Sequence, residues 1–261
     1  MQIKFVGRLS LGYSVCYYNK MIKTIIENIK TIIVALVLAI IIRSLLLQPF
    51  YIPSSSMEST LLVGDRLFVT KYSYGYSKHS FPFSPNVFNG RFLFSKPSRG
   101  DVVVFKTPSD NRTDYIKRLI GIPGDEIQFI KGDLYLNQKK INKQFVKKSV
   151  VNCGNYKFEV NLYNEEIDSN AIYQIAYSTQ NSMSDTDKFV VPKDHYFFLG
   201  DNRDCSKDSR FLSSVGYVSQ ENLVGKARFL FFSNEAEIGN FFTFWKWHKS
   251  IRFERILRKI N

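Results

Sequence analysis

The most pronounced hydrophobic pattern in the chain is an apolar run over residues 31–47, which only Arg43 and Ser44 interrupt. Its length is close to the roughly 20 residues that a helix needs to cross a bilayer, and an arginine near one end can reach the interface. The run is apolar on every side, which disfavours the buried helix of a soluble protein. Residues 48–51 lack the small-x-small cleavage pattern of a secretory signal peptide. We therefore predict a retained transmembrane anchor over residues 31–48.

After the anchor, short apolar strands alternate with turn residues. Apolar and polar residues alternate over 126–130, a turn follows at Lys131-Gly132-Asp133, and a second strand covers 134–137, which together predict a β-hairpin. Pro123-Gly124 predicts a type II turn, because glycine tolerates the positive φ that this turn requires. Further strands are predicted at residues 101–106, 115–122, 195–199 and 224–232.

The fold class that this pattern predicts is mostly β, with one amino-terminal transmembrane helix followed by a domain of coiled antiparallel β-sheets. Between about residues 139 and 188 the composition shifts to Asn, Ser, Asp, Gln and Tyr with short apolar runs, which is typical of a variable insertion. We expect residues 49–125 and 189–240 to form the β core. Residues 126–188 are expected to be an inserted β subdomain without chemistry of its own.

Two stretches rich in aromatic residues are candidates for contact with lipid. Residues 72–97 show neither a helical nor a strand period, so we expect a long loop whose apolar side chains fold onto the core or enter the membrane, and we favour the membrane. Residues 241–261 form a basic tail in which apolar and basic positions recur at helical spacing after Trp245. An amphipathic helix is expected there, either at the membrane interface or packed on the β domain.

The charge of the chain narrows its partners. The 261 residues carry a formal net charge of +13 and are 44% hydrophobic, which indicates a globular protein that attracts anions. No nucleic-acid motif accompanies the charge, so we expect anionic membrane lipids as partners and no nucleic acid. Residues 1–30 are basic, with Glu27 as their single acid, and Met21 is an alternative start. The positive-inside rule places this segment in the cytoplasm and the rest of the chain outside.

A candidate nucleophile lies directly after the anchor, where Ser54, Ser55 and Ser56 follow one another. A serine that does chemistry needs a neighbouring base and hydrogen-bond donors for the oxyanion that it creates. Histidine is the usual base, but the three histidines occupy a loop, a turn and the tail, and we interpret them as surface or turn residues: His79, His195 and His248.

A lysine kept neutral by burial is the other known base for a serine. Lys117 fits this role, because alternation along its strand places it on one face with Tyr115 and Leu119 in an apolar sequence. The alternative is an edge-strand lysine that points to solvent. From the residues alone, both interpretations of Lys117 stay open.

Four separated stretches follow one another behind the anchor. They are Pro53-Ser54-Ser55-Ser56-Met57 to Gly64-Asp65, residues 99–105 (RGDVVVF), residues 114–118 (DYIKR) to 121–125 (GIPGD), and residues 200–210 (GDNRDCSKDSR). In their order and spacing these stretches resemble type I signal peptidases, the membrane-bound Ser-Lys proteases of bacteria. The resemblance extends from the anchor to the tail. The chain departs from the family pattern with Ser59 in place of a frequent proline and Cys205 in place of a frequent asparagine.

The resemblance implies a serine endopeptidase that removes signal peptides from exported preproteins, cutting after small residues at the first and third positions before the bond. Ser56 would be the nucleophile and Lys117 the general base. The Ser54 hydroxyl and the Ser56 backbone N–H would stabilise the oxyanion. Neither a metal nor a cofactor is expected. We expect a monomer in the bacterial inner membrane, with its catalytic domain on the outer side.

Supporting residues are carried over by position. The resemblance implies that Ser206 hydrogen-bonds and orients the lysine, while Asp208 and Arg210 pair beside it. A calcium loop is the alternative for this acidic segment, but Arg203 stands where an acid or amide is needed, and interleaved Arg and Asp suggest an ion-pair network instead. The substrate would bind as an added strand, and its pockets would be lined by Phe50, Ile52, Pro53, Leu61, Tyr115 and Ile116. Core packing is the alternative for Leu61 and Ile116.

Other function classes remain as alternatives. A membrane-tethered β module that binds peptides without cutting them is one, and a self-cleaving Ser-Lys protease of the repressor type is another. Only Cys153 and Cys205 of the three cysteines could meet outside the cytoplasm, and we predict no obligatory disulfide between them. A nucleophilic Cys205 is a remote alternative, because it lacks a partner histidine.

Overall fold

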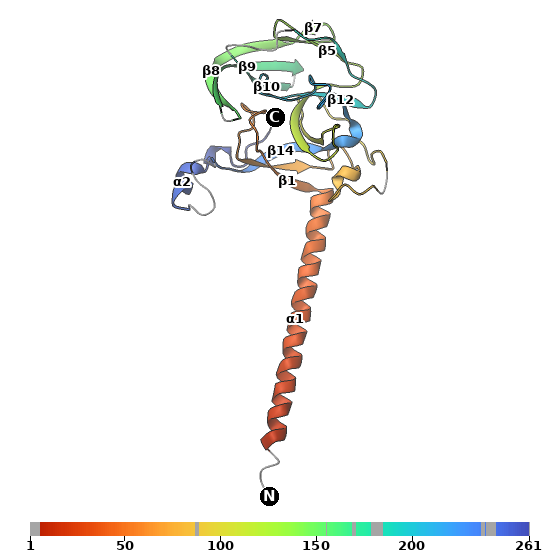
Figure 1. Ribbon diagram of the computed structural model, residues 1–261, viewed down its shortest axis with the longest axis vertical. Helices are drawn as coiled ribbons and strands as arrows, with labels where there is room; N and C mark the ends of the chain where they lie inside the picture. Colours follow the sequence, from red (N-terminus) through yellow and green to blue (C-terminus); the bar gives the residue numbers. More distant parts are fainter. Residues whose placement is uncertain are drawn as a thin grey trace. The chain divides into compact units, whose positions relative to one another are not determined.

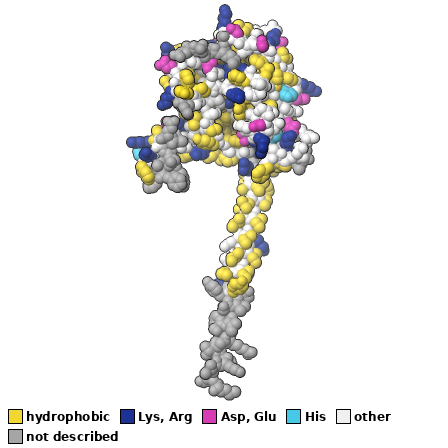
Figure 2. Space-filling model, viewed as in Figure 1, with side chains coloured by type: hydrophobic (Ala, Val, Ile, Leu, Met, Phe, Trp, Pro, Cys, Tyr) yellow, Lys and Arg dark blue, Asp and Glu magenta, His cyan; other side chains and the backbone are white. Residues whose placement is uncertain are grey.

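The computed structural model describes residues 6–86, 89–154, 156–168, 171–178, 185–235, 238 and 244–260. It divides into two compact units, Met1–Arg43 and Ser44–Asn261, and Figure 1 labels the elements of both. The first unit consists of helix α1 (Val6–Leu45), which ends two residues inside the second. Within α1, Lys20–Leu45 is apolar enough to cross a membrane, and hydrophobic side chains cover it in Figure 2. The helix ends before residue 48, because Leu47 already pairs in a strand.

The second unit contains a seven-stranded antiparallel sheet in the order β1-β2-β14-β3-β4-β12-β13. Side chains of β3 alternate between two buried clusters, with Val102 and Val104 in one and Val103 and Phe105 in the other. Because successive side chains of a strand point to opposite faces, both faces of this sheet are covered. The strands are β1 (Leu47–Tyr51), β2 (Asp65–Thr70), β3 (Val102–Lys106), β4 (Asp114–Gly121), β12 (His195–Leu199), β13 (Val218–Ser219) and β14 (Leu223–Ser233).

Two smaller sheets extend the domain (Figure 1). One has the order β11-β5-β6-β7 and the other the order β10-β9-β8. The predicted hairpin is confirmed as β5 and β6, and the predicted turn before it has Gly124 at φ +91°. The strands are β5 (Glu126–Ile130), β6 (Asp133–Leu136), β7 (Lys139–Lys140), β8 (Asn142–Cys153), β9 (Tyr156–Asp168), β10 (Ala171–Ser178) and β11 (Phe189–Val190).

The aromatic stretch over residues 72–97 is largely loop, as predicted, with a single 3-10 turn, η1 (Lys78–Ser80), among its described residues. Its apolar side chains divide between two environments. Phe94 packs against a buried cluster, whereas Phe83 and Phe92 are exposed. Phe88 lies outside the described residues. Contact of this loop with a membrane stays a prediction.

The continuous amphipathic helix expected in the tail is absent from residues 244–260. These residues form the short turns η3 (Phe244–Lys246), α2 (Trp247–Ser250) and η4 (Phe253–Arg255). The physical reason is that backbone hydrogen bonds to β14 interrupt the helical bonding of the tail: the N–H of Leu257 donates to the Leu230 carbonyl at 2.8 Å and the N–H of Ile260 to the Arg228 carbonyl at 2.9 Å. Residues 241–243 lie outside the described part.

Arg255 anchors this tail to the loop between β1 and β2. Its guanidinium is buried and donates Nε to Asp65 Oδ1 at 3.0 Å and Nη2 to the Thr60 carbonyl at 2.9 Å. Ile260 completes the buried cluster that contains Ile52 and Leu61. The tail is therefore part of the β domain.

We expect Arg255→Met to lower the free energy of unfolding by about 3 kcal/mol, because removing one member of a buried ion pair leaves the other charge uncompensated. For a domain of this size that corresponds to a fall of roughly 6–12 °C in melting temperature. The measurement is thermal unfolding of the full chain in detergent, followed by circular dichroism. Arg258→Met is the matched control, because Arg258 is exposed in the same tail. Equal effects of the two substitutions would contradict this role of Arg255.

Candidate active site

The three serines lie near the start of the loop that joins β1 to β2. Two backbone hydrogen bonds close this loop where the two strands end. The N–H of Ile52 donates to the Asp65 carbonyl at 2.9 Å, and the N–H of Gly64 donates to the Ile52 carbonyl at 3.0 Å. Met57 and Leu61 are fully buried and fasten the loop to the core. Ser56 lies directly before Met57 and is itself buried. The packing of Met57 in the core therefore fixes the position of Ser56.

The departure at Ser59 has a structural explanation. Ser59 adopts φ +106°, and its hydroxyl donates to the Gln174 carbonyl at 2.8 Å. Proline fixes φ near −65°, so it does not fit this backbone. The turn after Ser56 is therefore stabilised here by a hydrogen bond to β10 and not by a proline ring.

Lys117 is the basic residue that reaches Ser56. It is buried in β4, and its Nζ lies 2.5 Å from Ser56 Oγ and 3.1 Å from the Ile116 carbonyl oxygen. The side chain does not point to solvent, so the alternative of an exposed edge lysine is wrong. Tyr115 lies on the same face, as alternation predicted, with its ring centroid 5.3 Å from Nζ.

Burial lowers the pKa of Lys117 to about 8. The negative charges of Asp208 and Asp201 oppose this shift by raising the pKa, and Arg210 reinforces it. At pH 7 roughly a tenth of the Lys117 side chains are then neutral, whereas an ordinary lysine is almost entirely protonated. The site therefore holds an amine that can accept a proton near neutral pH.

The predicted supporting residues form the contacts expected near this pair, except that Ser206 does not form its expected hydrogen bond. Ser54 Oγ lies 3.4 Å from Ser56 Oγ. Asp208 and Arg210 form the predicted pair, with Nε to Oδ1 at 2.8 Å and Nη2 to Oδ2 at 2.9 Å. The expected hydrogen bond from Ser206 to Lys117 is absent, because the buried Ser206 Oγ has no partner among the described residues.

Gly200 brings the loop after β12 into contact with the serine segment. A Cβ atom at this position would lie 2.5 Å from the Ser56 carbonyl oxygen and 2.2 Å from Ser206 Oγ. Since real Cβ atoms do not come that close, no larger residue fits without displacing one of these serines. The Gly200 N–H donates to Asp208 Oδ2 at 3.0 Å. This hydrogen bond helps to hold Gly200 in place against Ser56 and Ser206.

The ion-pair network suggested by interleaved Arg and Asp is present and larger than expected. Arg118 and Asp201 are both 1% exposed and bond twice, with Nε to Oδ1 at 2.8 Å and Nη2 to Oδ2 at 2.7 Å. Arg203 pairs with Glu165 of β9, also at 1% exposure. Local sequence patterns do not indicate that Arg118 and Glu165 belong to this network, because their partners are distant along the chain.

A pocket of about 630 Å³ lies beside Ser56 and Lys117. Five of the six residues predicted for the substrate pockets line it: Phe50, Ile52, Pro53, Tyr115 and Ile116. The sixth, Leu61, is fully buried in the core cluster instead, so its role is packing. Several other residues that line the pocket were not predicted, because they have no distinctive chemistry or lie outside the segments that were expected to bind substrate. They are Val104, Thr113, Asp114, Gly154, Cys205 and Lys207.

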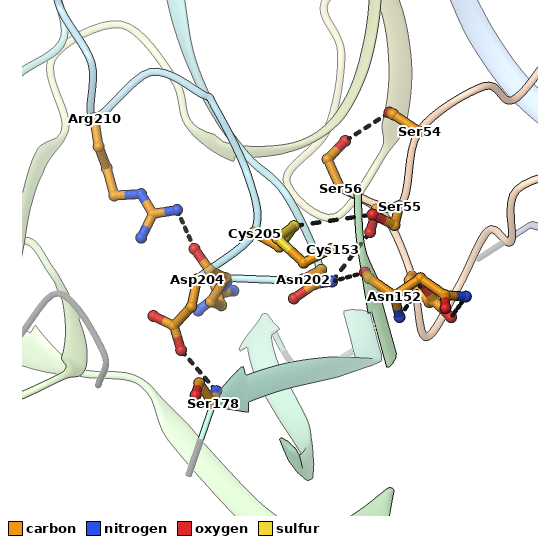
Figure 3. The surroundings of a disulfide bond; sticks show 12 residues. Ser54, Ser55, Ser56, Asn152, Cys153, Ser178, Asn202, Asp204, Cys205 and Arg210 are labelled. Atoms are coloured by element: carbon orange, nitrogen blue, oxygen red, sulfur yellow. Dashed lines mark hydrogen bonds between the residues drawn. A yellow bond between two sulfur atoms is a disulfide. The ribbon is translucent and has the colours of Figure 1, made fainter. Parts of the chain in front are cut away.

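Cys153 and Cys205 form a disulfide, with their Cα atoms 5.6 Å apart (Figure 3). This is the pair that the sequence singled out as able to meet, although no obligatory disulfide was predicted. The alternative of a nucleophilic Cys205 is wrong, because its sulfur is already bonded.

The histidines do not take part in this site. His79 lies in the turn η1, in agreement with the interpretation as a turn residue, but it is buried and not on the surface, and its Nδ1 lies 3.0 Å from Ser84 Oγ. Burial lowers the pKa of His79 to about 4. His195 Nδ1 lies 2.8 Å from the Lys193 carbonyl oxygen, and His248 is exposed. None of the three lines the pocket beside Ser56.

The chain is similar in sequence to proteins of one family. The chain matches the family model described as "Signal peptidase, peptidase S26" over residues 25–232. It is 39% identical to signal peptidase I of Rickettsia bellii (strain OSU 85-389), over 91% of this chain and 86% of that protein. It is 42% identical to signal peptidase I of Rickettsia conorii (strain ATCC VR-613 / Malish 7), over 85% of this chain and 88% of that protein. A solved signal peptidase I structure from Enterococcus faecalis V583 is 26% identical and covers 51% of this chain, with a TM-score of 0.30 that is too low to support a conclusion about the fold. The chain belongs to the signal peptidase family of S26 peptidases and is a membrane-anchored serine endopeptidase.

Proposed function

We propose that this enzyme removes the signal peptides of exported preproteins, with Ser56 as the nucleophile and Lys117 as the general base. The observation that carries the proposal is the 2.5 Å distance between Lys117 Nζ and Ser56 Oγ in a buried site. Burial makes the neutral amine available near pH 8, and proximity lets it take the hydroxyl proton as the nucleophile attacks.

The reaction follows from this pair. Ser56 Oγ attacks the scissile carbonyl carbon while its proton passes to Lys117 Nζ. When the carbon–nitrogen bond breaks, the ammonium returns that proton to the leaving amine, and the signal peptide stays esterified to Ser56. A water molecule then gives its proton to Lys117 and attacks the ester, and the proton moves to Ser56 Oγ as the enzyme is restored.

Stabilisation of the oxyanion is assigned to Ser54 and to the backbone of Ser56. The Ser54 side chain is exposed on the pocket wall, and its Oγ is 3.4 Å from the nucleophile. The Ser56 N–H donates no hydrogen bond to another described residue, so it is free to bind substrate. Two donors aimed at one developing charge are the usual arrangement in acyl transfer.

The preprotein is expected to bind as an added β-strand. β1 is an edge of the seven-stranded sheet, and the first half of β4 pairs with β3 on one side only, because β12 pairs with Arg118 and later residues. The pocket lies between Phe50–Ser56 and Thr113–Lys117, so main-chain groups of either segment can pair with an extended peptide. The preference for small side chains at the first and third positions before the cut is carried over from the family, and Ile52 and Ile116 are apolar residues that such side chains would contact.

The cellular setting is proposed from the charge pattern. Basic residues precede the apolar part of α1, which favours a cytoplasmic amino terminus and a single-pass protein of the bacterial inner membrane with its catalytic domain on the periplasmic side. The net charge of +13 supports anionic membrane lipids as further partners of a monomeric enzyme.

Ser56→Ala and Lys117→Met should each lower kcat by a factor on the order of 10⁴ or more, because both groups act in one step. The measurement is cleavage, in detergent, of a preprotein with alanines at the first and third positions before the bond. Lys139→Met is the control for loss of a lysine, since Lys139 is exposed in β7. Cutting that survives Lys117→Met would identify another base, and a wild-type chain that does not cut would favour the tethered binding module.

The pH dependence of kcat/KM should report the pKa of Lys117. Below pH 8 the ammonium form predominates and cannot accept a proton, so the rate is expected to fall about tenfold per pH unit. Above pH 8 it should reach a plateau, because burial has lowered the pKa of Lys117 to about 8. The substrate should have no titratable groups near the scissile bond, so that the fall of kcat/KM below pH 8 reflects the enzyme alone. A rate that is level between pH 6 and 9 would contradict a lysine base.

Ser54→Ala should lower kcat by roughly 10²-fold, the usual cost of losing one oxyanion donor, with a smaller change in KM. Ser54→Thr keeps a hydroxyl and is the conservative control that should recover part of the rate. Equal rates for wild type and Ser54→Ala would remove Ser54 from the mechanism and leave the Ser56 N–H as the remaining donor.

A further inference from the structure

The Cys153–Cys205 disulfide forms part of the wall of the catalytic pocket. Cys205 and the neighbouring Gly154 line the pocket beside Ser56. On its other side the disulfide borders a second pocket of about 270 Å³, which Val151 and Phe158 also line. Both cysteines are partly exposed, so a reductant can reach the sulfur atoms. Figure 3 shows the bond close to the serine segment, where Ser55 Oγ lies 3.9 Å from Cys205 Sγ.

Three segments that are distant along the chain meet at this bond: residues 54–58, 151–154 and 200–206. Asn202 joins all three, because its N–H donates to the Ser56 carbonyl at 3.2 Å and its Nδ2 to the carbonyls of Ser55 at 3.2 Å and Asn152 at 3.3 Å (Figure 3). Asn152 is in turn held by Glu58, whose carboxylate accepts its backbone N–H at 2.9 Å and its Nδ2 at 3.3 Å. The disulfide is the covalent link in this ring of neutral and charge-assisted hydrogen bonds.

The residues just after Cys205 lie between two segments that are anchored to the rest of the domain. Residues 201–204 are held by β10, since the N–H of Arg203 donates to the Ala176 carbonyl at 2.9 Å, the N–H of Ala176 to the Asp201 carbonyl at 2.9 Å, and the N–H of Ser178 to Asp204 Oδ2 at 2.7 Å. Asp208 is fixed by Arg210. Between these two anchors, Ser206 and Lys207 make no hydrogen bond to another segment within the described part of the chain.

The position of Ser206 matters to the nucleophile. Ser206 packs against Gly200, and Gly200 packs against the Ser56 carbonyl, so a shift of residues 205–207 is transmitted through two contacts to Ser56. Ser56 Oγ must stay within hydrogen-bond reach of Lys117 Nζ, and a displacement of about 1 Å in such a pair can cost 10²-fold in rate.

We infer that the Cys153–Cys205 disulfide is a positioning element of the catalytic centre, which holds residues 205–207 against Gly200 and the Ser56 segment. The inference rests on the proposed function, because it assigns the disulfide a role in the Ser56–Lys117 reaction. A dithiol reductant breaks the bond by transferring two electrons and two protons, which gives two cysteine thiols and the cyclic disulfide of the reductant. Reduction is expected to lower kcat by roughly tenfold to a hundredfold with KM changed less, and reoxidation is expected to restore kcat.

The experiment uses the full chain in detergent with Cys16→Ser, so that only Cys153 and Cys205 can respond. Preprotein cleavage is measured for the oxidised protein, for protein reduced with dithiothreitol, and for the reduced protein after reoxidation. Alkylation followed by mass spectrometry counts the free thiols in each state. Cys153→Ser/Cys205→Ser is the matched control, which should cut like the reduced protein and be insensitive to dithiothreitol.

Folding is separated from positioning by circular dichroism. The melting temperature of the reduced protein is measured first, and kcat is then compared well below it, where both forms are folded. A reversible loss of kcat in folded protein supports the inference. Equal kcat for oxidised and reduced protein, a loss that only follows the unfolded fraction, or free thiols in the untreated protein would each overturn it. Failure of the proposed function looks different, because the oxidised protein would then not cut at all or would still cut with Lys117→Met.

Discussion

The burial of one amine next to one hydroxyl is the constraint on which the proposed catalytic centre depends. In the proposed mechanism Lys117 can act as a base only while water is kept away from it, because hydration stabilises the ammonium form. Two carboxylates nearby, Asp208 and Asp201, act in the opposite direction and favour the ammonium. Each of them is bonded to its own arginine, so that the lysine is surrounded by neutral pairs and not by free negative charge.

That arrangement gives the buried ion pairs a purpose beyond stability. A buried ion pair contributes little to folding free energy compared with apolar side chains of the same size. Here the pairs Arg118–Asp201 and Arg210–Asp208 hold the carboxylates near Lys117 in place, and Arg210 offsets part of the rise that these carboxylates cause in the pKa of Lys117. The same acids also hold neighbouring loops, since Asp208 accepts the backbone N–H of Gly200 and Asp201 accepts the side-chain hydroxyl of Thr60.

Local patterns predicted the parts of this structure that local forces determine. Alternation along β4 placed Lys117 beside Tyr115, and turn chemistry predicted the Pro123-Gly124 turn and the hairpin after it. The tail failed this test: its helical spacing is genuine, but backbone bonds to β14 and the burial of Arg255 outweigh the helical preference of a short segment. The partners Glu165 and Arg118 could not be found from the sequence, because each pair is closed by tertiary contacts between distant segments.

The anchoring of the tail by Arg255 determines when, during synthesis of the chain, the β domain can complete its packing. Residues 252–260 leave the ribosome after every strand of the β domain, and they supply the guanidinium on Asp65 and the side chain of Ile260 that complete the support beneath the serine loop. The loop that carries Ser56 therefore reaches its final packing only when synthesis has passed these residues. Until then Asp65 lacks the guanidinium that pairs with it, and the cluster around Ile52 and Leu61 lacks Ile260.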